Sequence, residues 1–77
     1  MRKFRLKVFQ FRLEVMYGSG IMLLAAANEK MAKEHVEKTN KEMREGQWKF
    51  EKQLDNVHYA SPDKSHVVLL TIHTRIE

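Results

Sequence analysis

The sequence predicts an α+β fold in which two strands, one helix and two further strands follow one another along the chain (ββαββ). Alternating polar and apolar residues near the N-terminus indicate a half-buried strand. An amphipathic pattern in the middle indicates a helix, and a β-branched stretch near the C-terminus indicates a last strand. We therefore expect a four-stranded, mainly antiparallel sheet with the helix packed on one of its faces.

Length and composition favour a single small domain over residues 1–77. Chains of 77 residues allow one core and bury only about 60% of their unfolded surface. Hydrophobic residues make up 43% and charged residues 31% of the sequence, which is typical of a globular rather than a disordered chain. Cysteine is absent, which rules out disulfides, thiolate metal sites and a cysteine nucleophile, and favours a cytoplasmic location.

The first predicted strand covers residues 3–17. Its apolar residues follow one parity up to Val8 and the other parity from Phe9 onward. A β-bulge near residues 8–9 would keep these side chains on one face, and two separate strands are the alternative interpretation. With the bulge, the opposite face carries the polar residues Arg5, Lys7, Gln10, Arg12 and Glu14.

A turn, a second strand and the helix are predicted next. The segment Gly18-Ser19-Gly20 is typical of a tight turn, because glycine readily adopts positive φ. The unbroken apolar residues 21–27 predict a strand that is buried on both faces. Asn28 is a good N-cap for a helix over residues 29–45. The predicted sheet-facing stripe of this helix is Ala32, Val36, Thr39 and Met43.

The C-terminal part of the chain predicts two more strands. The periodicity weakens over residues 47–55, so we expect a connector with anchoring side chains there, with one extra turn of helix as the alternative. Residues 56–60 and 66–76 predict strands that form a hairpin across a turn around Pro62.

Two of the predicted strands are apolar on both sides, and one helix can cover only one face of a sheet. An uncovered apolar face would favour aggregation in a monomer. We therefore expect the second face to be buried in a homodimer, with edge pairing of the first or last strand as the alternative. The expected interface residues are Met22, Leu24, Val67 and Leu69.

The charge distribution suggests a second function, binding of single-stranded nucleic acid. The whole net charge of +4 comes from the first strand, where residues 1–12 contain only basic charged side chains. Arg5, Lys7 and Arg12 are the expected phosphate contacts. Against this function, alternation places the aromatic residues of the same strand in the core, where they cannot stack on bases.

The sequence contains no convergent set of catalytic or metal-ligating residues, so we expect a non-enzymatic protein without a cofactor or metal. His35 has no histidine at i+4, and the hairpin register expected for His58 and His66 puts them on opposite faces. An active site would require two chains, for example through His58, Tyr59 and His66.

The apolar stretch of residues 21–27 is much shorter than the roughly 20 residues of a membrane span, so we expect no membrane association. Residues 1–27 have some features of a secretory signal, but Lys7, Arg12 and Glu14 interrupt its apolar segment. The sequence therefore favours a small binding or assembly module that self-associates through its sheet.

Overall fold

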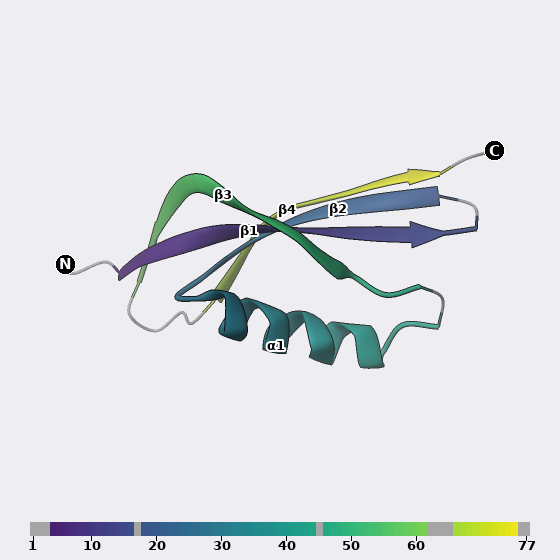
Figure 1. Cartoon of the computed structure of the whole chain (residues 1–77), viewed down its shortest axis with the longest axis horizontal. Coiled ribbons are helices and arrows are strands. Elements are labelled where there is room, and N and C mark those ends of the chain that lie inside the picture. The colour runs from purple at the N-terminus through teal and green to yellow at the C-terminus, as the bar shows by residue number, and fades with distance from the viewer. Residues whose placement is uncertain (1–3, 17, 45, 62–65, 76–77) are drawn as a thin grey trace.

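A computed structural model describes residues 4–16, 18–44, 46–61 and 66–75 of the chain. Within these residues, four antiparallel strands form one sheet and one helix lies along one side of it (Figure 1). The elements are β1 (Phe4–Val15), β2 (Gly18–Ala26), α1 (Glu29–Lys41), β3 (Lys49–Ala60) and β4 (His66–Arg75). The predicted α+β class and ββαββ order are confirmed.

The strands β1 and β2 form a hairpin, and its register runs without interruption from the pair Lys7–Ala26 to the start of β2 at Gly18. The turn predicted at residues 18–20 is therefore wrong, because both glycines lie inside β2. Gly20 has a packing role instead. A Cβ atom at this position would lie 2.9 Å from Cη2 of Trp48, so only glycine leaves room for the indole ring.

The predicted bulge near residues 8–9 of β1 is also wrong. Because the register with β2 is continuous, Val8 and Phe9 point to opposite faces of the sheet. Phe9 lies in the core under α1, whereas Val8 belongs to a smaller apolar cluster. The irregularities occur instead where β1 pairs with β3, and the extra residues belong to β3: Glu51, Asp55 and Asn56.

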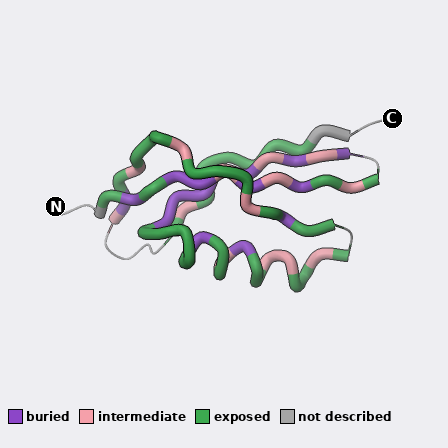
Figure 2. Tube along the Cα trace, in the orientation of Figure 1, coloured by how far each residue is buried: buried purple, intermediate pink, exposed green. Residues whose placement is uncertain are grey.

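The main core lies between the sheet and α1, and Figure 2 shows buried residues along the central strands and the sheet-facing side of the helix. Ala32 and Val36 of the predicted helix stripe are buried. The Asn28 side chain caps the helix, accepting a hydrogen bond from the backbone N–H of Met31 at 2.9 Å. The helix ends at Lys41, four residues before the expected end. The largest fully buried side chains are Phe9, Phe11 and Leu24.

Trp48 fixes the connection between α1 and β3. Its indole is buried in the main core, and its backbone is held by the side-chain amide of Asn40. Asn40 Oδ1 accepts from the Trp48 N–H at 2.7 Å, and Asn40 Nδ2 donates to the Trp48 carbonyl at 3.0 Å. The strand β3 begins directly afterwards at Lys49, so most of the expected connector at residues 47–55 is strand.

The order of strands across the sheet is β3-β1-β2-β4, which places β3 and β4 at opposite edges. The predicted hairpin between residues 56–60 and 66–76 is therefore wrong, because β3 pairs with β1 and β4 pairs with β2. Of the turn predicted at residues 61–64, residues 62–64 lie outside the described residues.

Candidate functional site

The edge strand β4 carries the main apolar surface of the described residues. It pairs with β2 along one side, and no other described strand pairs with its second side. Such an edge presents unpaired backbone N–H and C=O groups to any chain that can add a strand. Its apolar side chains are between 37% and 48% exposed at Val68, Leu69, Leu70 and Ile72.

The register with β2 shows on which side of the sheet each of these side chains lies. Val68 is opposite Leu24, which is buried under α1, so Val68 lies on the helix side. The next residue of β2, Leu23, is opposite Leu70, so Leu69 is the extra residue of a β-bulge. Leu70 consequently lies on the far side of the sheet. The exposed apolar side chains of β4 therefore lie on both sides of the sheet. This distribution indicates an apolar surface that follows the edge strand rather than one face of the sheet.

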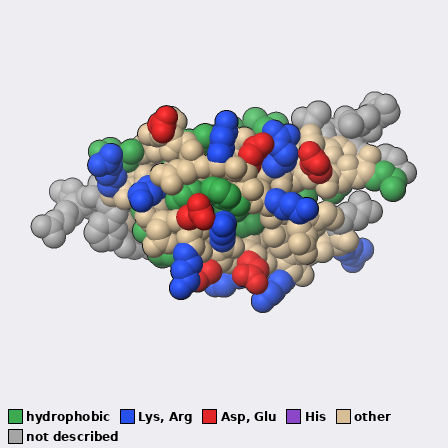
Figure 3. Space-filling view, viewed as in Figure 1, with side chains coloured by type: hydrophobic (Ala, Val, Ile, Leu, Met, Phe, Trp, Pro, Cys, Tyr) green, Lys and Arg blue, Asp and Glu red, His purple; other side chains and the backbone are tan. Residues whose placement is uncertain are grey.

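The opposite edge strand, β3, has the features that normally protect an edge from pairing. Charged side chains and bulges discourage the addition of another strand, and β3 has two register shifts. Figure 3 shows acidic and basic side chains interspersed over β3 and α1. The charged residues of β3 are Lys49, Glu51, Lys52 and Asp55. By contrast, β4 contains no Asp, Glu, Lys or Arg before its last residue.

The four predicted interface residues lie in two different environments. Met22 and Leu24 face α1 and are buried in the main core, so the expectation that they form an outer contact surface is corrected. Val67 is half-buried beside Ala25 on the far side of the sheet, and Leu69 is exposed at the bulge. Of the predicted set, only Val67 and Leu69 belong to the β4 edge.

The predicted nucleic-acid contacts are also separated by the structure. Arg5 and Lys7 are exposed and share one side of β1, whereas Arg12 lies on the other side. Arg12 Nε is 2.9 Å from Glu51 Oε1, and Gln10 donates to the second carboxylate oxygen. The hydrogen bonds from Gln10 and Arg12 lower the pKa of Glu51 below its ordinary value. The charge of Arg12 is therefore already balanced by a carboxylate.

Tyr59 lies near Arg5 and Lys7, the two predicted nucleic-acid contacts that form no ion pair with another described residue. It is 60% exposed and directly opposite Arg5 in the pairing of β3 with β1. Val57 is opposite Lys7 in the same register. This end of the sheet extends beyond the start of α1 (Figure 1). The sequence contained no signal for this arrangement, because it depends on β3 pairing with β1.

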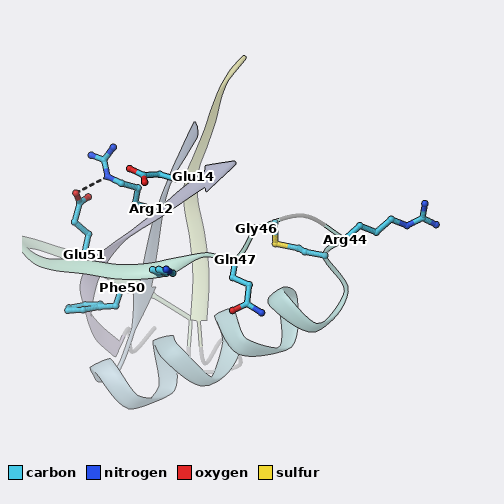
Figure 4. A pocket seen from close by; sticks show the side chains of 9 residues that line it. Arg12, Glu14, Arg44, Gly46, Gln47, Phe50 and Glu51 are labelled. Atoms are coloured by element: carbon cyan, nitrogen blue, oxygen red, sulfur yellow. Dashed lines mark hydrogen bonds and ion pairs between the residues drawn. The ribbon is translucent and has the colours of Figure 1, made fainter. Parts of the chain in front are cut away.

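A hollow of about 570 Å³ opens next to the Arg12–Glu51 ion pair, as Figure 4 shows. Its charged lining residues are of both signs: Arg12, Glu14, Arg44, Lys49 and Glu51. Its described lining contains no His, Ser, Thr, Tyr or Cys side chain. The described lining of the hollow therefore does not contain a Ser–His or Cys–His pair of the kind used in nucleophilic catalysis.

The histidines form contacts that do not resemble a metal site. The rings of His35 in α1 and His66 in β4 stack with centroids 3.8 Å apart. Burial lowers the pKa of His35, and the nearby His66 and Lys38 lower it further. His58 lies on the opposite sheet edge from His66, so one chain does not bring them together. No group of three or more His, Cys, Asp or Glu residues within the described ranges could hold a metal ion.

Comparisons with known proteins do not assign a family. The chain matches no protein-family model, and comparison with curated proteins and with solved structures gives no match. In the part of the chain that the structure describes, no helix has the length and apolar character needed to cross a membrane.

Proposed function

We propose that the protein is a non-enzymatic assembly module whose sheet binds a second copy of the same chain. The observation that carries this proposal is the exposed, uncharged and apolar edge strand β4. A strand of this kind pairs readily with another strand, and burial of its side chains favours association. The lack of cysteine fits a reducing compartment, so we propose a cytoplasmic location.

A second copy is the partner that the charge pattern favours. Because β4 has no charged side chain before Arg75, two identical strands can approach without like-charge repulsion along most of their length. An isologous contact of this kind closes with two-fold symmetry, so it gives a dimer and leaves the charged β3 edges outward.

The substitution Ile72→Lys tests this proposal. Ile72 is 48% exposed, so the change should leave the protomer folded while placing a charge in the proposed contact. We expect the molar mass measured by light scattering to fall from the dimer to the monomer. Far-UV circular dichroism checks that the variant keeps its fold.

The matched control is Gln53→Lys, which adds the same charge to the exposed β3 edge. We expect this variant to have the mass of the unmodified chain. An unchanged mass for Ile72→Lys, or an equal loss of mass for both variants, would show that β4 is not the contact.

A second function is favoured by the position of Tyr59. Sheet surfaces that bind single-stranded nucleic acid combine basic residues with an exposed aromatic ring on which a base can stack. Arg5, Lys7 and Tyr59 provide this combination at one end of the sheet. We propose oligonucleotide binding at these three residues as the alternative to a purely structural role. Arg12, one of the three contacts expected from the sequence, is not part of this proposed site, because its side chain forms an ion pair with Glu51.

Fluorescence anisotropy with a labelled single-stranded oligonucleotide over a salt series tests this alternative. Each phosphate contact to a single strand contributes about 0.7 to the salt slope, so neutralising Arg5 and Lys7 together should lower the slope by about 1.4. Tyr59→Ala should weaken binding about 5- to 160-fold, whereas Tyr59→Phe keeps the ring. Lys30→Gln on the exposed side of α1 is the charge control. No binding at low salt, or binding that ignores salt, would rule this function out.

A further inference from the structure

We infer that two copies of the chain join by antiparallel pairing of β4 with β4, with the two-fold axis between Leu69 and Leu70. The two sheets then form one continuous sheet of eight strands. This inference rests on the proposed self-association and specifies which residues of the two copies lie opposite each other. It follows from the bulge in β4 and from the side of the sheet on which each residue lies.

The pairing of β4 with β2 divides its residues between the two sides of the sheet. Those on the far side are Val67, Leu70 and Ile72, which lie opposite Ala25, Leu23 and Ile21. Those on the helix side are His66, Val68, Thr71 and His73, which lie opposite Ala26, Leu24, Met22 and Gly20. Ring contacts of His66 with His35 in α1 and of His73 with Trp48 agree with this assignment.

Residues directly opposite each other in an antiparallel pair project on the same side of the sheet. An axis between Leu69 and Leu70 meets this condition for every pair formed by residues 66–68 with residues 71–73. The far-side pair is Val67 with Ile72, and the helix-side pairs are Val68 with Thr71 and His66 with His73. A shift of the register by one residue would place helix-side residues opposite far-side residues, and would separate the apolar side chains.

The bulge is the reason that the axis falls between two residues. Opposite residues in this register have numbers of different parity, which a regular strand would place on opposite sides. The extra residue Leu69 reverses the alternation, so that Val67 and Ile72 share the far side. In this register the bulge of one β4 strand lies opposite the bulge of the other. Leu69 and Leu70 of one copy therefore face Leu70 and Leu69 of the second copy, and neither strand has an unmatched extra residue.

Other registers satisfy the same condition over fewer apolar residues; an axis at Ile72, for example, leaves Val67 and Val68 opposite residues beyond the end of β4. The main alternative has its axis between Val68 and Leu69. It places Val67 opposite Leu70, but it leaves Ile72 opposite residue 65, which precedes the start of β4. The register centred between Leu69 and Leu70 covers all of the exposed apolar side chains of the strand. We therefore choose it, and the experiment distinguishes between the two.

Disulfide trapping tests this register, since the natural chain contains no cysteine. Two single variants, Val67→Cys and Ile72→Cys, are purified separately, mixed and oxidised mildly, and the crosslinked species are identified by mass spectrometry. We expect a crosslink between the two variants in the mixture and none in either variant alone. In each homodimer the two thiols lie five residues apart along the strand, about 17 Å, beyond the roughly 7 Å Cα separation that a disulfide spans.

A second pair, Val68→Cys with Thr71→Cys, tests the helix side with two exposed positions, so the test does not depend on the half-buried Val67. The negative control is Val67→Cys with Thr71→Cys, which project on opposite sides of the sheet. Crosslinking of Val67→Cys with Leu70→Cys in place of Ile72→Cys would overturn the proposed register.

Light scattering on the same samples distinguishes a wrong register from a failure of the chain to self-associate. A dimer that forms none of the expected crosslinks would overturn the register and leave self-association standing. A monomer at every concentration would overturn both.

Discussion

The side-chain amide of Asn40 connects the end of α1 to the start of β3. Its two hydrogen bonds hold both backbone polar groups of Trp48, and the indole of Trp48 fills the core beside Gly20. The side chain of Asn40 therefore positions the buried indole of Trp48. It also sets the direction in which β3 begins. This contact explains how a strand can begin directly at Lys49 after a short connection.

We expect Asn40→Ala to lower the free energy of unfolding by about 1–3 kcal/mol, because two partly buried backbone groups lose their partners. Urea denaturation followed by tryptophan fluorescence measures this change. The neighbouring exposed substitution Lys41→Ala is the control and should stay within about 0.5 kcal/mol. Equal effects of the two substitutions would contradict the anchoring role.

The stacked pair of His35 and His66 makes stability depend on pH. The pKa of His35 is lowered from 6.5 by burial and by the nearby His66 and Lys38. Glu34 and Met31 also line this site. As pH falls below about 6.5, the unfolded chain takes up a proton that folded His35 still excludes, so the free energy of unfolding decreases. Above this pH the contribution is complete and constant.

Denaturation at a series of pH values should therefore show a loss of stability on acidification that is smaller in His35→Gln. His58→Gln, at a position on the opposite edge strand, controls for the removal of one histidine. Identical pH profiles for the unmodified chain and His35→Gln would contradict this account.

Several residues could be predicted from the sequence because their roles are local. The N-cap Asn28 and the helix-stripe residues Ala32 and Val36 depend only on helical periodicity and capping. The position of Tyr59 opposite Arg5 depends on how β3 pairs with β1, and the hydrogen bonds of Asn40 with Trp48 depend on the path of the connection after the helix. No local pattern contains that information.

The two edge strands differ in how clearly their sequences indicate a strand. The β-branched and aliphatic residues of β4 predicted it directly, apart from the bulge at Leu69. The extra residues of β3, at Glu51 and at Asp55 with Asn56, interrupt its alternation of polar and apolar residues. The first half of the strand therefore could not be recognised from the sequence. The same irregularities that protect β3 from pairing therefore make it difficult to recognise.

Hydrogen exchange should distinguish the two edges. In an unpaired edge strand, alternate backbone N–H groups face solvent and exchange rapidly. We expect both sets of amides to be protected in β4, because the proposed second copy would pair with its outer side. In β3 the outward amides should exchange rapidly.

The substitution Ile72→Lys should remove protection from the outward amides of β4 and leave its inward amides protected through β2. Rapid exchange of the outward β4 amides in the unmodified chain, at concentrations where the mass is that of a dimer, would contradict edge pairing.

For the whole molecule, the fold class could be predicted from the sequence, but the strand order could not. The fold class followed from the periodicity of the strands and the helix. The partner, expected from the amount of apolar surface in relation to one helix, remains a proposal. The strand order β3-β1-β2-β4 separates two strands that are adjacent in the sequence. It moves the proposed contact from Met22 and Leu24, which the helix covers, to the edge at β4.

The account also predicts that association depends on concentration. A contact between two single edge strands is smaller than the interfaces of permanent dimers, so the two protomers should separate on dilution. Each protomer keeps its own core between the sheet and α1 and should remain folded when it separates.

Self-association through β4 is tested by the absolute molar mass, measured by light scattering over a concentration series. We expect a mass approaching twice 9.2 kDa at high concentration and falling toward 9.2 kDa on dilution, without the absorbance of bound nucleic acid. A constant mass of 9.2 kDa at every concentration would contradict self-association through β4.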